Sequence, residues 1–149
     1  MDKIKVRRYL SSDKETIYRI KKILYEKYYI ELYGKWDEDN QKSFHEQFIK
    51  DRRNDIWIIQ LNTKDIGFYN GNEIDYNNYE IENICILPEY QNRGIGTQIL
   101  KYILKVHNNQ NILLEYYKKN PVGNLYKRLG FIKYKEEDNH YKLIFKQSN

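Results

Sequence analysis

Several residue types that would mark an exported, membrane-spanning or metal-binding protein are scarce in this sequence. A single cysteine, Cys85, excludes an internal disulfide and fits a reducing cytoplasm. No stretch approaches the roughly 20 apolar residues of a membrane helix, and the opening residues, MDKIKVRRYL, lack the apolar core of a signal peptide. The three histidines are far apart, and no Cys/His cluster has the spacing of a metal site. We therefore expect a cytoplasmic protein with no metal and no membrane association.

The charge of the chain is mildly basic but follows no pattern. The 26 Lys and Arg residues exceed the 21 Asp and Glu residues, and the net charge of +5 favours anionic ligands. The basic residues are scattered, and acidic groups at 37–39 and 136–138 interrupt them. Because there is no basic stripe and no recognition-helix motif, the sequence argues against nucleic acid as a partner. The length of 149 residues and the 40% hydrophobic content predict one globular domain, spanning 1–149.

Hydrophobic periodicity and turn residues divide the chain into strands and helices. Strands are expected at 4–9, 56–61, 66–69, 80–87, 111–116, 131–134 and 141–145. Helices are expected from Ser12, the start of a capping box with Glu15, to about residue 32, from 37–40 onward, at 94–106 and at 120–130. Residues 70–78 are polar and are expected to form a loop. The order βααβββαβαββ predicts a single α/β (α+β) domain with a mixed, mostly antiparallel sheet flanked by helices.

The stretch 88–100, PEYQNRGIGTQIL, places two of only seven glycines at the start of a helix. The first turn of a helix has unpaired N–H groups and a positive dipole end, so it attracts anions. Gly94 and Gly96 allow the backbone to approach a phosphate closely, and Gln91 and Arg93 add donors. The pattern is neither a Rossmann fingerprint, whose third glycine is replaced by Ile99, nor a P-loop. It predicts a pyrophosphate-binding loop, with a simple strand-to-helix turn as the alternative.

Two motifs resemble those of one enzyme family. Gln91-x-x-Gly94-x-Gly96 resembles the acetyl-CoA signature Q/R-x-x-G-x-G/A of the GCN5-related N-acetyltransferases (GNAT family). Further on, NPVGNLYKRLGF at 120–131 resembles the later motif of that family, N-x-x-A-x-x-L-Y-x-x-x-G-F, with Gly123 in place of the usual alanine. The motifs occur in the family's order and within its order of elements. The resemblance extends over the whole chain and is clearest at 80–131.

The resemblance implies acetyl-CoA as cosubstrate and assigns residues to it. In the family, two parallel strands, here 80–87 and 111–116, splay apart and the pantetheine arm lies in the gap. The backbone of Ile86 and Leu87 would pair with pantetheine, and the N–H groups of 91–97 would hold the pyrophosphate. The implied set is Ile86, Leu87, Gln91, Asn92, Arg93, Gly94, Ile95, Gly96, Thr97, Asn120, Asn124 and Lys127. Asn120 would also serve as the N-cap of the helix that follows, which is its alternative role.

The implied chemistry is direct attack of an amine on the thioester, which needs a base for the amine proton and an acid for the thiolate. Tyr126 matches the position of the family's general acid. Glu80 and Glu82 face the same side of an otherwise apolar strand, which suits a wet cleft that binds a cation, so either is a candidate base. The alternative is that both are solvated or ion-paired. Cys85 lies on the opposite face with no histidine at motif spacing, so we do not expect a covalent enzyme intermediate.

The acceptor and the quaternary structure stay open at this level. Trp36 and the acids at 37–39 either combine an aromatic wall with a cation-attracting rim or simply favour the start of the second helix. The acceptor could be a small amine, an antibiotic, a polyamine or a protein amine. The final strand, 141–145, would pair with a second copy in a homodimer if it lies at the sheet edge. Alternative functions are a non-catalytic acyl-CoA-binding domain of the same fold and a small basic nucleic-acid-binding protein.

Overall fold

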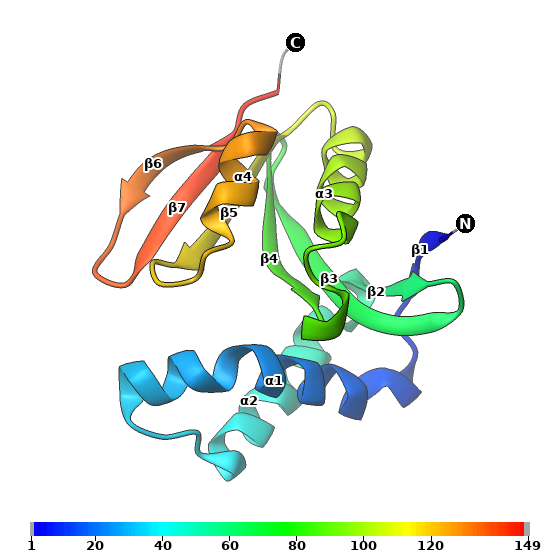
Figure 1. The fold of residues 1–149 in the computed structure, drawn as a ribbon, viewed down its shortest axis with the longest axis vertical. Coiled ribbons are helices and arrows are strands. Elements are labelled where there is room, and N and C mark those ends of the chain that lie inside the picture. Colours follow the sequence, from blue (N-terminus) through cyan, green and yellow to red (C-terminus); the bar gives the residue numbers. More distant parts are fainter. Residues whose placement is uncertain (1, 148–149) are drawn as a thin grey trace. The chain divides into compact units, whose positions relative to one another are not determined.

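The structure, a computed structural model, describes residues 2–147. The chain forms two compact units (Figure 1). The first unit contains the residues up to Asn70 together with Asn83–Gln91, and the second contains Gly71–Glu82 together with Asn92–Asn149. Of the helices in the described part of the chain, none is long and apolar enough to cross a membrane.

Seven strands form one mixed sheet, hydrogen-bonded in the order β1-β2-β3-β4-β5-β7-β6. The chain order is β1 (Ile4–Arg8), α1 (Lys14–Tyr33), α2 (Glu38–Arg52), β2 (Ile56–Leu61), β3 (Lys64–Asp75), β4 (Asn78–Ile86), α3 (Ile95–Val106), β5 (Asn111–Tyr117), α4 (Gly123–Leu129), β6 (Ile132–Glu136) and β7 (His140–Phe145). Strands β4 and β5 are parallel, whereas β1–β2, β2–β3, β5–β7 and β6–β7 are antiparallel. The order βααβββαβαββ and the mostly antiparallel sheet are therefore confirmed.

The expected loop at 70–78 is wrong. Strand β3 continues to Asp75, and only a two-residue turn separates it from β4. Asp75 holds this turn, because its Oδ1 accepts hydrogen bonds from the Asn77 backbone N–H at 2.8 Å and from the Asn78 amide at 3.0 Å. Asn70 is fully buried inside the strand, where its Oδ1 accepts a hydrogen bond from Asn83. Hydrogen bonds to Asn70 and Asp75 thus help polar residues to continue a strand here.

The first unit has a core between the helices α1 and α2 and the strands, and Figure 1 shows the two helices lying beside each other. The buried residues of this core are Ile17, Ile20, Ile49, Ile56, Ile58, Phe68 and Cys85. Burial of each large apolar side chain stabilises the fold by roughly 1.5–3 kcal/mol. Helix α1 ends at Gly34, whose φ of 86° is left-handed and closes the helix with a hydrogen bond from its N–H to the Ile30 carbonyl.

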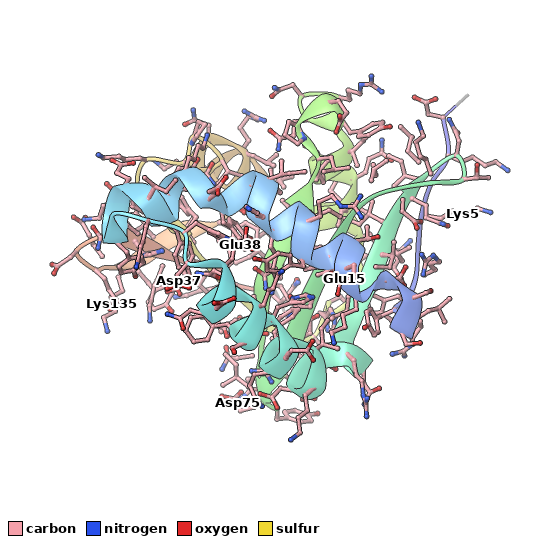
Figure 2. All side chains as sticks on the ribbon, turned by 90° about the horizontal axis from the view of Figure 1, so that it is seen from below. Lys5, Glu15, Asp37, Glu38, Asp75 and Lys135 are labelled. Carbon is pink, nitrogen blue, oxygen red and sulfur yellow. The ribbon has the colours of Figure 1, made fainter. Side chains whose placement is uncertain are left out.

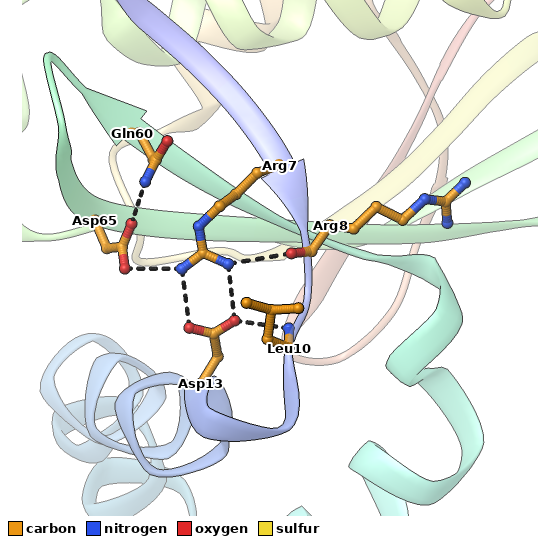
Figure 3. A network of polar contacts seen from close by, with 6 residues as sticks. All are labelled: Arg7, Arg8, Leu10, Asp13, Gln60 and Asp65. Atoms are coloured by element: carbon orange, nitrogen blue, oxygen red, sulfur yellow. Dashed lines mark hydrogen bonds and ion pairs between the residues drawn. The ribbon is translucent and has the colours of Figure 1, made fainter.

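The start of α1 differs from the expected capping box at Ser12. The 3₁₀ turn Ser11–Asp13 precedes α1, and Asp13 accepts a hydrogen bond from the Leu10 N–H at 2.8 Å. The same carboxylate binds Arg7 through two nitrogens, each at 2.9 Å (Figure 3). Arg7 also donates to Asp65 at 2.9 Å. A two-nitrogen contact of a guanidinium with a buried carboxylate is stronger than a serine cap, so Asp13 fixes where the helix begins.

This network predicts how stability depends on pH. The hydrogen bonds from Arg7 hold the pKa of Asp13 below its usual value. The unfolded chain then binds more protons than the native chain, so stability falls as the pH drops below about 4. Asp13→Asn is expected to lower the free energy of unfolding by about 2 kcal/mol at pH 7. Urea unfolding of both proteins between pH 7 and pH 2.5 checks this, and a difference that does not shrink toward low pH would contradict it.

In the second unit, β7 lies between β5 and β6. It pairs with β5 from His140 to Phe145 and with β6 on its other side. The final strand is therefore internal, and the edge at this end of the sheet is β6. The homodimer expected through pairing of the final strand has no structural basis, because both sides of that strand already have partners.

Candidate functional site

The loop before α3 contains two exposed residues with left-handed backbone conformation. Asn92 and Gly94 have left-handed φ angles of 62° and 80°, and both residues are exposed. Among the described side chains, none caps the first turn of α3, and that turn has no acidic residue. A Cβ atom added at Gly94 would have no atom within 4 Å, so the space in front of the turn is open. The loop therefore presents the N–H groups of a helix N-terminus to an anion.

The helix behind this loop is firmly anchored. Ile95, Ile99, Leu100 and Ile103 are each 3% exposed or less and form the inner face of α3. They recur at helical spacing, and the bounds predicted from that spacing agree closely with α3. The N-terminal end of α3 is thus held in place by apolar packing.

The end of β4 distinguishes the two residues expected to pair with pantetheine. The Leu87 N–H donates to the Ile66 carbonyl at 2.9 Å, and the Leu87 carbonyl accepts from the Tyr90 N–H at 2.9 Å. The backbone groups of Leu87 are therefore already engaged within the chain. The Ile86 carbonyl accepts from the Gln91 side chain at 2.8 Å, a contact that rotation of one exposed side chain can release. Of the two, Ile86 is the better candidate for pairing with a ligand.

The parallel pairing of β4 with β5 is short. It joins Asn78, Tyr79 and Glu80 to Asn111, Ile112 and Leu113. Within this unit, the pairing that the structure describes ends at Glu80 and Leu113. Strand β5 continues to Tyr117 and pairs with β7 from Ile112 to Tyr117. Ladder hydrogen bonds between these strands are thus limited to their first residues, as expected of strands that separate.

The second motif forms the turn and helix after β5. Asn120 Oδ1 accepts a hydrogen bond from the Val122 N–H at 3.0 Å, and α4 begins at Gly123, later than expected. Asn120 therefore holds the turn that leads into the helix. Asn124 and Lys127 are exposed on α4. A Cβ at Gly123 would clash with the Tyr116 hydroxyl, so the alanine usual in the family would require the Tyr116 ring to move.

The three candidate catalytic side chains are all in the second unit. Tyr126 is only 5% exposed, and its ring packs against Tyr116 and Phe131 with centroids 5.6 and 5.8 Å away. Glu80 is partly exposed and lies opposite Leu113 in the sheet, whereas Glu82 is exposed. The second unit thus contains a buried phenol and two carboxylates that are at least partly exposed, the group types of an acid and a base, respectively.

Cys85 is unsuited to nucleophilic chemistry. Its side chain is 1% exposed and its Sγ lies 3.0 Å from the Tyr25 hydroxyl. Burial raises the pKa of the thiol to about 11, so it is protonated at neutral pH. Among residues 2–147, no group of three or more His, Cys, Asp or Glu residues is arranged to hold a metal ion.

The acids near Trp36 are engaged in helix capping and ion pairing. Figure 2 shows Asp37 and Glu38 at the beginning of α2. Asp37 accepts a hydrogen bond from the Asn40 N–H at 3.1 Å and is the N-cap. Glu38 binds the Lys22 ammonium and accepts from the Tyr18 hydroxyl, and the contact with Lys22 lowers its pKa. These contacts support the interpretation that the acids favour the start of α2.

The structure also contains a pocket that the sequence analysis missed. It lies in the first unit and is lined by residues of α1, α2, β4 and the α1–α2 connection. Tyr18, Tyr25 and Tyr29 line it from α1 and are separated by seven and four residues, so they share one helix face. That spacing is the one signal that could have revealed the pocket.

Comparisons with known proteins agree on one family. A family model described as an acetyltransferase (GNAT) domain matches residues 52–133, more than half of the chain. A search of curated protein sequences gives no match. The solved structures that are similar include the PaiA N-acetyltransferase from Thermoplasma acidophilum in complex with coenzyme A, which is 20% identical with a TM-score of 0.71 over 98% of this chain and 99% of that one.

Two further solved structures have the same fold. An N-acetyltransferase from Staphylococcus aureus Mu50 is 18% identical, with a TM-score of 0.76 over 94% of this chain and 99% of that one. The ribosomal-protein-S18-alanine N-acetyltransferase from Escherichia coli is 16% identical, with a TM-score of 0.68 over 99% and 97%. Identities this low show the fold alone, but the residues that the family model matches, 52–133, include both sequence motifs. The chain therefore belongs to the GNAT acetyltransferase family.

Proposed function

We propose that this protein is an acetyl-CoA-dependent N-acetyltransferase that moves an acetyl group directly to an amine acceptor. The observation that carries the proposal is the loop before α3, where left-handed Asn92 and Gly94 leave an uncapped helix N-terminus open to an anion. A pyrophosphate is the anion that this arrangement suits. The proposal treats 1–149 as one domain, because β3 and β4 each run through both units.

The residues that would hold acetyl-CoA are assigned to one part of the cofactor at a time. The backbone N–H groups of 91–97 would bind the pyrophosphate, and the Arg93 side chain adds positive charge. The Ile86 backbone would pair with pantetheine once Gln91 rotates away from its carbonyl. Asn120, Asn124 and Lys127 belong to the turn and helix of the second motif and would lie along the cofactor. Acetyl-CoA supplies the acetyl group in activated form, as a thioester.

The chain's own side chains move the protons. Alkylamines are mostly protonated at neutral pH, so the acceptor must lose a proton before its nitrogen can attack. Glu80, with Glu82 as the alternative, accepts that proton directly or through water. A C–N bond forms, the C–S bond breaks, and Tyr126 donates a proton to the departing thiolate. The acetylated nitrogen loses its second proton through water, which restores the Tyr126 hydroxyl. The products are the acetylated amine and the CoA thiol, and no covalent enzyme intermediate is needed.

Calorimetric titration with acetyl-CoA tests the foundation of this proposal. We expect binding at one site with micromolar affinity, because the loop and helix N-terminus are preformed. A panel of amines, read by release of the CoA thiol, then tests transfer. No heat of binding up to millimolar acetyl-CoA would mean that Asn92 and Gly94 only shape a turn, and the proposal would fail.

Gly94→Ala is expected to separate the binding role of the loop from its structural role. The φ of 80° makes alanine unfavourable by about 1 kcal/mol. The new Cβ touches no protein atom but occupies the space where the phosphates would lie, so the affinity for acetyl-CoA should fall about tenfold or more. Titration calorimetry measures the affinity and urea unfolding the stability.

Gly34→Ala is the matched control for this variant. Gly34 has a φ of 86° and likewise has no atom within 4 Å of an added Cβ, but it ends α1. The Gly34→Ala protein should lose as much free energy of unfolding as the Gly94→Ala protein and should keep the natural protein's affinity for acetyl-CoA. Equal affinities of the Gly94→Ala and Gly34→Ala proteins would show that the loop does not hold the pyrophosphate.

A further inference from the structure

The pocket of the first unit has the size and the lining of a small-molecule site. Its volume is about 290 Å³, at the lower end of the roughly 300–1,000 Å³ typical of ligand pockets. Six of its ten lining residues are aromatic, namely Tyr18, Tyr25, Tyr29, Trp36, Phe44 and Phe48. They come from both helices and from the segment that joins them. A flat apolar ring is the ligand group that such walls contact best.

The charge of the lining disfavours a cation inside the pocket. Among the described lining residues, Lys21 alone carries a full charge, and there is no carboxylate. The Lys21 ammonium lies 3.1 Å from the centroid of the Phe48 ring, so the cation–π position on that ring is already taken. The nearby Glu38 is bound to Lys22 and Tyr18. A linear polyamine would thus meet a like charge and no counter-charge.

His45 provides a specific polar contact for a ligand. The residue is 6% exposed, and its Nε2 lies 2.8 Å from the Lys14 carbonyl, which can only accept. Nε2 therefore carries the hydrogen, and burial lowers the pKa of the ring so that it is neutral at pH 7. Nδ1 is then an acceptor, and it has no hydrogen-bond partner among the described residues. A buried acceptor without a donor is unfavourable, and a ligand N–H or O–H would relieve it.

Several other polar groups of the pocket already have partners. The Tyr25 hydroxyl lies 3.0 Å from Asn83 Oδ1, and Asn83 Nδ2 donates to Asn70 at 2.8 Å. His45 Nδ1 is the buried lining acceptor that has no hydrogen-bond partner among the described residues. Asn83 also connects the pocket to the proposed cofactor contact, because Ile86 follows three residues later on the same strand, about 10 Å away.

We propose that the pocket binds the aromatic ring of an arylalkylamine acceptor. The ring packs among the six aromatic side chains and its N–H or O–H donates to His45 Nδ1. The amine stays outside the lining, away from Lys21. This inference rests on the proposed function, and it names the acceptor class for that reaction.

Titration with tryptamine, whose indole ring has one N–H donor, tests the proposal without acetyl-CoA. The benzofuran analogue has an oxygen in place of that N–H and otherwise the same shape. We expect tryptamine to bind about tenfold more tightly than this analogue, and 1,4-diaminobutane not to bind. In the His45→Phe protein, whose ring has no hydrogen-bond acceptor, the tenfold difference should disappear. Equal affinities of the natural protein for tryptamine and the benzofuran would overturn the proposal.

Two tryptophan variants show where the ligand binds. Gln41 lines the pocket on α2, so Gln41→Trp should fill it and abolish tryptamine binding. Lys42 is its exposed neighbour outside the lining, and Lys42→Trp should bind normally. Thermal unfolding of both variants confirms that they are folded. Unchanged tryptamine binding by Gln41→Trp would overturn the assignment of the pocket.

Thiol release with acetyl-CoA separates failure of this inference from failure of the proposed function. If acetyl-CoA binds and the diamine is acetylated but tryptamine is neither bound nor acetylated, the acceptor class is wrong and the enzyme function stands. If the natural protein and Lys42→Trp bind tryptamine, Gln41→Trp does not, and acetyl-CoA does not bind, the proposed function fails and the pocket ligand is not an acceptor.

Discussion

Replacing Tyr126 by phenylalanine is expected to lower kcat about 100-fold and to leave the affinity for acetyl-CoA nearly unchanged. The substitution removes one oxygen from a ring that is 5% exposed and packed against Tyr116 and Phe131, so the ring itself should stay in place. What is lost is the proton donor for the thiolate. A proton donor acts in the transition state and not in the bound state, so its loss lowers kcat and leaves ligand affinity alone.

Tyr116→Phe is the control for this measurement. Tyr116 packs against the same ring, and its hydroxyl lies against the backbone of Gly123. The Tyr116→Phe protein loses the same hydroxyl oxygen from a ring in the same unit. No catalytic role is assigned to Tyr116, so the rate of thiol release by this variant should match that of the natural protein. An unchanged kcat in Tyr126→Phe would remove Tyr126 as the acid. If the natural protein binds acetyl-CoA and releases no thiol with any amine, the chain is a non-catalytic acyl-CoA-binding domain.

The elements with strong local signals could be predicted from the sequence. Helix α3 runs from Ile95 to Val106, as expected, because Pro88 and Gly94 mark its approach and Ile95, Ile99 and Ile103 repeat at helical spacing. The left-handed Gly130 likewise ends α4 where its sequence position indicates. The order of all helices and strands is confirmed for the same reason, since each element carries its own periodicity.

Features that depend on distant partners could not be predicted. Asn70 indicates a loop by composition, yet it lies in β3 because Asn83 supplies its hydrogen bond from thirteen residues away. Asp13 sets the start of α1 through Arg7 and not through a local cap. The position of β7 inside the sheet follows from its pairing with β5 and β6, which no local pattern encodes.

The same division applies to the candidate site. The loop before α3 is a local pattern, and Gly94 of that pattern is left-handed, whereas Gly96 is not and Asn92 is left-handed without a glycine to mark it. The hydrogen-bond acceptor that we propose for the pocket, His45 Nδ1, could not be predicted from a local pattern. His45 Nδ1 matters only because Lys14, 31 residues earlier, fixes the hydrogen on the other nitrogen. The engaged backbone of Leu87 is also a consequence of tertiary structure, because its partner is Ile66 on β3.

Gly67→Ala is expected to lower the free energy of unfolding by about 4 kcal/mol, the largest effect among the stability variants considered. A Cβ at this position would lie 2.0 Å from the Cys85 carbonyl oxygen and 3.1 Å from its carbon. These are backbone atoms of β4, so no side-chain rotation can relieve the clash and the strands must move apart. Glycine is needed here for close approach, since its φ is not left-handed.

Urea unfolding of Gly67→Ala beside Gly34→Ala measures this effect. Gly34→Ala measures the cost of a left-handed alanine that clashes with nothing, about 1 kcal/mol. A smaller loss of the free energy of unfolding in Gly67→Ala than in Gly34→Ala would contradict the prediction. The clash also bears on the proposed function. Gly67 follows Ile66, whose carbonyl accepts from the Leu87 N–H and so holds the end of β4 next to Ile86. If strand separation breaks this contact, Gly67→Ala should weaken acetyl-CoA binding while the protein is still folded, because the Ile86 backbone would no longer be held in position for pantetheine.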